Sequence, residues 1–263
     1  MTVRARCALY VLAVAVWAAS VAGYAFTFVV HLRLDDLVRT DLATDGSAAV
    51  VYGAALFSAA TVGLVVSIRQ PRHPVGWLFL ALSVCLAIGA AGDAFALDRG
   101  VVGEARSNAV GVALVAGQAS FIAWFALLAA ILHLTPTGRT LSRRWRVCLI
   151  VTEVSAALSL LAKAMQDTPF EAPFRTLRNP FAVTSIQDPV DLVAGVGISL
   201  VALGLVIGAV SLVVRFRRAE GVEREQLRWM TLVAAAVPVL LVASVVAALT
   251  GVVVVRTVGT AAR

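Results

Sequence analysis

Three polar side chains lie inside long apolar stretches of this sequence, where a polar group must be paired, hydrated or protonated. They are Glu153, Gln118 and Asp93. Glu153 follows Arg146, the last arginine of a basic cluster, by seven residues, which is about 10 Å along a helix. A carboxylate at that depth in a bilayer is a candidate ligand or proton site, because an unpaired charge there is costly. The alternative is a structural hydrogen bond to a hydroxyl or backbone carbonyl group.

Gln118 and Asp93 are open to the same two interpretations. Gln118 lies well inside an apolar stretch, where its amide is suited to hydrogen bonding between helices. Asp93 lies near the end of its stretch, within reach of water, and Arg99 or Lys163 are potential partners. We therefore treat Glu153, Gln118 and Asp93 as a candidate intramembrane polar site.

No other group of residues predicts catalysis or a bound cofactor. His31, His73 and His133 all lie at the edges of apolar stretches, whereas a transmembrane haem needs facing ligands inside a bundle. The three cysteines share no short spacing, which argues against a zinc site or a disulfide framework. The sequence has no HExxH or GxSxG motif and no phosphate-binding glycine loop. We predict no catalytic, cofactor or metal site and no enzymatic activity.

Long apolar segments must position these polar residues. Of the 263 residues, 60% are hydrophobic and 14% are charged, against roughly 25% charged residues in a soluble domain. An apolar segment of about 20 residues is long enough to cross about 30 Å of hydrocarbon. The sequence predicts an all-α, polytopic membrane helix bundle, a single transmembrane domain with no soluble domain. Its seven transmembrane helices are expected at about 7–30, 48–68, 75–96, 109–134, 147–165, 189–214 and 229–255.

The connections between these segments alternate in charge. Alternate connections, beginning with the N-terminal segment, hold 13 of the 22 basic residues: Arg4, Arg6, Arg69, Arg72, Arg139, Arg143, Arg144, Arg146, Arg215, Arg217, Arg218, Arg224 and Arg228. Most acidic residues fall in the other connections. Because basic loops stay in the cytoplasm, this pattern predicts a plasma-membrane protein with its N-terminus inside and its C-terminus outside. The net charge of +7 then reflects topology and anionic lipid, not binding to nucleic acid.

One acidic connection, 166–188, has an unusual composition. Three prolines interrupt it, which argues against a long helix. Phe170, Phe174 and Phe181 lie beside these prolines and need an apolar environment. Either the connection folds back over the end of the bundle, or its aromatic side chains anchor in the membrane interface.

The longest charged run in the chain extends from Arg215 to Trp229, between the last two apolar segments. We interpret it as a cytoplasmic coupling loop, with candidate residues Arg215, Arg217, Arg218, Glu223, Arg224, Arg228 and Trp229. In the segment before it, Gly204 and Gly208 have the spacing that permits close approach of helices. That approach serves either packing within one chain or a homodimer.

Four short motifs follow one another along the connections. They are Arg69-Gln-Pro-Arg-His-Pro74-Val-Gly-Trp77, Leu134-Thr-Pro-Thr-Gly138-Arg139, Asn179-Pro180-Phe181 and the run from Arg215 to Trp229. In this order they resemble the membrane-integral input region of actinobacterial sensor histidine kinases. The resemblance implies a sensor-type membrane module. It implies no kinase activity, because we find no phosphoacceptor or ATP-binding sequence in the chain.

These observations lead to one functional hypothesis and one alternative. The hypothesis is a sensor or receptor input module, which detects a membrane or extracytoplasmic signal and passes it to a cytoplasmic signalling protein. The alternative is a small transporter or permease in which Glu153 and Gln118 line a polar path. The expected partners are the lipid bilayer, the cytoplasmic protein and a second copy of the chain.

Overall fold

The computed structural model describes residues 3–36, 46–102, 107–168, 170, 174–175 and 177–218. This part of the chain is helical and has no strand. Its long helices are α1 (Val3–Asp36), α2 (Gly46–Arg69), α3 (Pro74–Ala96), α4 (Asn108–Leu134), α5 (Arg143–Met165) and α6 (Gln187–Arg218). A π-helical turn, η1 (Leu97–Val102), extends α3, and a 3-10 turn, η2 (Thr184–Ile186), precedes α6. Each of the six long helices is long and apolar enough to cross a membrane.

Helices are thus confirmed at six of the seven predicted positions. The seventh predicted span, 229–255, lies outside the described residues, as do Glu223, Arg224, Arg228 and Trp229. One prediction was wrong in detail. Arg215, Arg217 and Arg218 belong to the last turn of α6 and not to a loop, because α6 continues beyond its apolar segment. Arginine is a good helix former, and a positive charge at a helix C-terminus is favourable.

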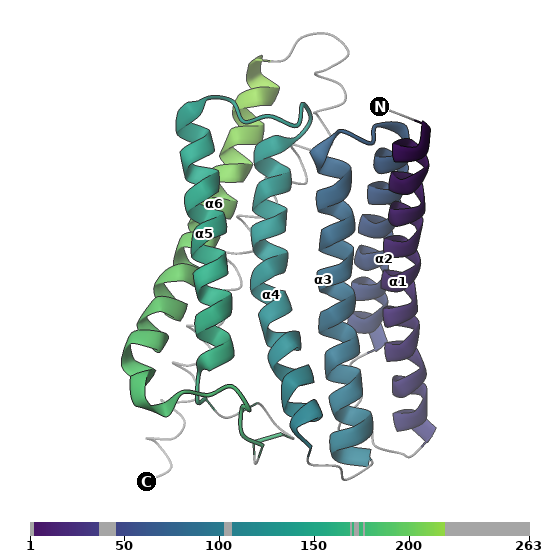
Figure 1. Cartoon of the computed structure of the whole chain (residues 1–263), viewed down its shortest axis with the longest axis vertical. Helices are drawn as coiled ribbons and strands as arrows, with labels where there is room; N and C mark the ends of the chain where they lie inside the picture. The colour runs from purple at the N-terminus through teal and green to yellow at the C-terminus, as the bar shows by residue number, and fades with distance from the viewer. Residues whose placement is uncertain are drawn as a thin grey trace.

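Prolines mark the ends of two helices. Pro74 occupies the first turn of α3, where the missing N–H has no intrahelical partner to lose. At the other turn, α4 ends at Leu134, just before the Thr135–Pro136 pair. Gly138, with φ of +72°, then reverses the chain toward α5. These two turns, which we call the α2–α3 turn (70–73) and the α4–α5 turn (135–142), lie at the same end of the bundle (Figure 1).

The six helices run alternately up and down and form two groups of three (Figure 1). Within one group α1, α2 and α3 all contact one another, and within the other α4, α5 and α6 do the same. The groups meet chiefly where α3 packs along α4. Apolar side chains of α4 contribute to clusters on both sides of this contact, with Ile131 on the α3 side and Leu132 on the α6 side.

Antiparallel order collects the arginines at one end of the bundle. This arginine-rich end comprises the N-terminus of α1, the α2–α3 turn, the α4–α5 turn and the C-terminus of α6 (Figure 1). Among the described residues these segments contain arginines but no acidic residue: Arg4, Arg6, Arg69, Arg72, Arg139, Arg143, Arg144, Arg146, Arg215, Arg217 and Arg218. At the opposite end Asp98 pairs with Arg33 at 3.6 Å and with Arg99 at 3.7 Å.

Small residues let α6 approach its neighbours closely. A Cβ atom added at Gly204 would lie 2.8 Å from the Cβ of Thr152 on α5. One added at Gly208 would lie 2.8 Å from Nδ1 of His133 on α4. Both glycines of the Gly204–Gly208 spacing are therefore used in packing within the chain, the first of the two uses that the sequence left open.

The 166–188 connection folds back onto the bundle. Phe170 and Phe174 are buried in a cluster with Val110 and Leu114 of α4. Asn179 holds the connection in place, because its Nδ2 donates hydrogen bonds of 2.8 Å to the carbonyl oxygens of Ala164 and Gln166. Its Oδ1 also accepts a 2.9 Å hydrogen bond from the backbone N–H of Phe181. The Phe181 side chain itself is exposed, so the fold-back interpretation holds for two of the three phenylalanines.

Candidate functional site

The arginine-rich end contains one buried arginine. Arg215, near the C-terminus of α6, has only 8% of its surface exposed. Its Nη1 donates a 3.0 Å hydrogen bond to Oγ1 of Thr137, and its Nη2 donates a 2.7 Å hydrogen bond to the carbonyl oxygen of His133. Nη2 also donates to the carbonyl oxygen of Arg139. We call these four residues the Arg215 clasp, because one guanidinium joins α6 to the α4–α5 turn.

The clasp follows from the way α4 ends. The last carbonyl groups of a helix have no intrahelical donor, and a basic side chain can satisfy them. The carbonyl group of His133 is in this position, one residue before the last residue of α4. Planar guanidinium with several N–H donors can reach separate acceptors at once, which the single ammonium group of a lysine does less well.

His133 lies beneath the clasp and is fully buried. Its Nδ1 lies 2.9 Å from the carbonyl oxygen of Ala129, and its ring meets the ring of Trp145 edge-on at a centroid distance of 6.3 Å. Gly208 of α6 packs on its other side. His133 thus fills the junction of α4, α5 and α6, although its position at the edge of an apolar segment had indicated an interfacial residue.

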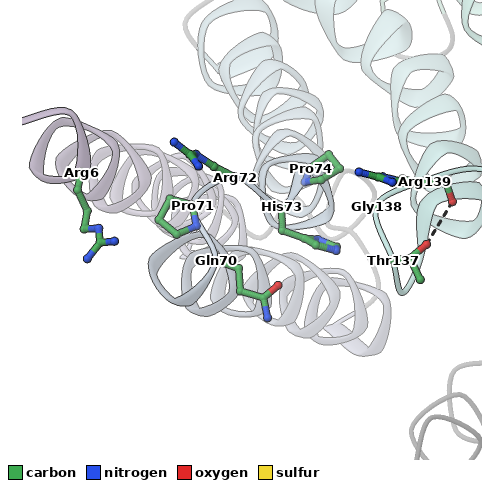
Figure 2. A pocket seen from close by; sticks show the side chains of 9 residues that line it. All are labelled: Arg6, Gln70, Pro71, Arg72, His73, Pro74, Thr137, Gly138 and Arg139. Atoms are coloured by element: carbon green, nitrogen blue, oxygen red, sulfur yellow. Dashed lines mark hydrogen bonds between the residues drawn. The ribbon is translucent and has the colours of Figure 1, made fainter. Parts of the chain in front are cut away.

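A depression of about 540 Å³ adjoins the clasp (Figure 2). We call it the basic pocket, and its lining comes from α1, the α2–α3 turn, the start of α3 and the α4–α5 turn: Arg6, Gln70, Pro71, Arg72, His73, Pro74, Thr137, Gly138 and Arg139. The two turns touch, since a Cβ atom at Gly138 would lie 2.9 Å from Cδ of Pro74. The α2–α3 turn is braced by a 2.9 Å hydrogen bond from Nε1 of Trp77 to the carbonyl oxygen of Pro71.

Two residues belong to both the pocket and the clasp. Arg139 lines the pocket, while its carbonyl oxygen accepts a hydrogen bond from Arg215. Thr137 also lines the pocket, and its Oγ1 accepts from Arg215 and donates to the carbonyl oxygen of Arg139 at 3.4 Å. The α4–α5 turn therefore connects the surface of the pocket physically to the end of α6.

Glu153 lies within α5, away from both features. It precedes Leu160 by two helical turns, and Leu160 packs against Ile122 and Ala126 of α4, so this side of α5 faces α4. Oε1 of Glu153 is buried and has no hydrogen-bond partner in the part of the chain that is described. The hydroxyl group of the adjacent Thr152 donates to the carbonyl oxygen of Cys148 at 2.9 Å, so it does not serve as the donor to Glu153.

The three polar residues predicted from the sequence are distributed over two helix interfaces. Asp93 faces α4 from α3, because a Cβ atom at Gly117 would lie 2.9 Å from its Oδ1. Gln118 precedes Ile122 by one helical turn and so shares the face of α4 that meets α5 and α6. Measured along the helices from the arginine-rich end, Gln118 is about 9 Å deeper than Glu153. The residues contribute to separate places in the bundle.

The clasp was missed by sequence reasoning, but a signal for it exists. Gly204, Gly208, Ser211 and Arg215 follow one another at spacings of four, three and four residues. Such spacing places all four on one side of a helix. Because glycines and a serine mark the packed side of α6, the same pattern would have predicted that Arg215 is buried against a neighbouring helix.

The fold and these sites define a helical bundle whose six long helices can each span a membrane, with a basic pocket and a buried arginine at one end. No protein-family model, curated protein or solved structure matches the chain. The resemblance to the input region of sensor kinases therefore depends on the four sequence motifs and stays a prediction.

Proposed function

We propose that this protein is a sensor input module of the plasma membrane, which passes a membrane or extracytoplasmic signal to a cytoplasmic signalling protein. In this proposal the arginine-rich end faces the cytoplasm, because basic connections are retained on that side. The N-terminus is then inside, and a seventh span at 229–255 takes the C-terminus outside. The segment from Arg217 to Trp229 contacts the partner.

The Arg215 clasp is the observation that supports this function. A sensor needs an element that links the packing of its membrane helices to the segment its partner reads. Arg215 belongs to α6, three residues before the end of that helix, and its hydrogen bonds go to the turn between α4 and α5. A shift of α6 against α4 or α5 therefore has to stretch or break the clasp, and this moves the residues that follow α6.

The close packing of α6 makes such a shift a discrete event. Gly197, Gly204 and Gly208 bring α6 against Ser159, Thr152 and His133. Interfaces packed this tightly change between distinct arrangements and do not deform gradually. A signal that alters the contact between α5 and α6 would thus be converted into a made or a broken clasp.

We would test the proposal with a photo-cross-linking amino acid at Arg218, which is exposed at the end of α6. In native cells we expect it to capture one cytoplasmic protein reproducibly. Arg215→Gln should reduce the capture because it opens the clasp, whereas Arg217→Gln, a change at an exposed neighbour, should not. Equal capture by the two variants would contradict the role of the clasp. Labelling of Ala219→Cys by an impermeant reagent outside intact cells would contradict the orientation.

Glu153 favours a second function, a small transporter. A buried carboxyl oxygen without a partner in the described structure is typical of an ion or substrate path. Gln118, on the α4 face toward α5, would extend this path. Reconstituted protein should then move a solute or proton across liposomes, and Glu153→Gln should abolish this transport while the protein stays folded. That result would replace the sensor proposal.

A further inference from the structure

The basic pocket collects positive charge without a neutralising acid. Arg6, Arg72 and Arg139 line it, together with His73, and none of its lining residues is acidic. The arginines come from three separate segments, namely α1, the α2–α3 turn and the α4–α5 turn (Figure 2). Like charges that a fold brings together repel one another, and a bound anion relieves this repulsion.

Neutral groups of the pocket also suit an anion. The side chains of Gln70 and Thr137 carry N–H and O–H donors. Pro74, another lining residue, begins α3, so the positive end of a helix dipole lies at the wall of the pocket. Arginines, neutral donors and a helix N-terminus together are the groups with which proteins bind phosphate.

The level of the pocket indicates where such a phosphate would come from. The indole N–H of Trp77 bonds to Pro71 in the pocket wall, and tryptophan side chains collect at the headgroup layer of a bilayer. The pocket also lies at the end of helices that are long enough to span the membrane. A phospholipid phosphate is present at that level in high local concentration, and anionic lipids are attracted by basic residues there.

We propose that the basic pocket binds a phosphate group, which in the membrane is the headgroup phosphate of an anionic phospholipid. Arg72 and Arg139 contact the phosphate from the two turns, and Arg6 completes the site from α1. This proposal is independent of the sensor function, because it depends on the pocket alone. If both proposals hold, an occupied pocket anchors the α4–α5 turn and so favours the closed Arg215 clasp.

The test uses the full-length protein in nanodiscs, with retained lipid measured by native mass spectrometry. We expect phosphatidylglycerol to be retained in preference to phosphatidylcholine, with one tightly held molecule in excess of the diffuse shell. Arg72→Gln combined with Arg139→Gln should weaken this retention at least about tenfold, because two charge-assisted contacts are lost. The matched control is Arg143→Gln combined with Arg144→Gln. It removes the same charge from exposed positions at the same end, outside the pocket.

Equal loss of lipid from the pocket variant and the control would overturn the proposal, because it would show only diffuse attraction to a basic surface. Equal retention of the two lipids by the unchanged protein would also overturn it. A parallel arm adds glycerol phosphate to protein in phosphatidylcholine nanodiscs. Binding there that the pocket variant loses, without preference for phosphatidylglycerol, would assign the phosphate to a soluble ester. A circular dichroism melt of each variant shows that the bundle is folded.

Discussion

The tightest contact of α6 leads to a prediction about a single methyl group. Gly204→Ala places a Cβ atom 2.5 Å from Cγ2 and 2.8 Å from Cβ of Thr152. Rotation of the Thr152 side chain can move Cγ2 away, at the cost of its 2.9 Å hydrogen bond to Cys148. Rotation cannot move Cβ, so α5 and α6 must separate by about 0.6 Å to restore an ordinary contact of 3.4 Å.

Gly195 on the same helix provides the matched control, because an added Cβ there meets nothing within 4 Å. Both changes to alanine gain similar helix propensity, so the difference between them isolates the packing contact. Forcing an extra methyl group into a packed interface costs about 1–3 kcal/mol. We therefore expect Gly204→Ala to be less stable than Gly195→Ala by about 1–3 kcal/mol.

The assay is reversible unfolding in mixed micelles, followed by circular dichroism. Addition of Thr152→Gly to Gly204→Ala should restore part of the lost free energy, because it removes the atoms that clash. Two results would refute the reasoning. One is equal stability of the two alanine variants. The other is the absence of any rescue by Thr152→Gly, which would mean that Gly204 packs against something other than α5.

Three further predictions follow from single side chains. Arg215→Gln should lower the free energy of unfolding by about 1–3 kcal/mol, since it leaves buried acceptors unpaired, and Arg217→Gln should change it by less than about 0.5 kcal/mol; similar effects would contradict the clasp. Asn179→Ala should speed hydrogen exchange of the backbone at 177–183, while Arg178→Ala, an exposed neighbour, should leave it unchanged. Glu153→Leu should raise the free energy of unfolding by about 1–3 kcal/mol, because it removes an unpartnered buried oxygen, and a loss of stability would indicate that Glu153 has a partner.

The sequence was a good guide to the helices. An apolar segment of about 20 residues is dictated by the thickness of a bilayer, and its length can be counted directly. Pro74 and Pro136 marked helix ends for a local steric reason that needs no knowledge of the fold. These signals are local, and for this reason six helices lie within a few residues of their predicted positions.

The candidate site was far less accessible. Arg6, Arg72 and Arg139 are separated by more than sixty residues at each step, and only the antiparallel packing of the helices brings them to one pocket. The burial of Arg215 was hidden by its position in a charged run, because charge normally indicates a solvated segment. Only the small residues that precede it on α6 show which side of the helix is packed.

The division into two groups of three helices has a consequence for biogenesis. Each group satisfies most of its helix contacts internally, and α3 with α4 provides the main contact between them. During synthesis the N-terminal trio can pair up before α4 leaves the ribosome, so the final step is docking of two preformed units. Two separately translated fragments, divided between η1 and α4, should for the same reason find each other in a membrane.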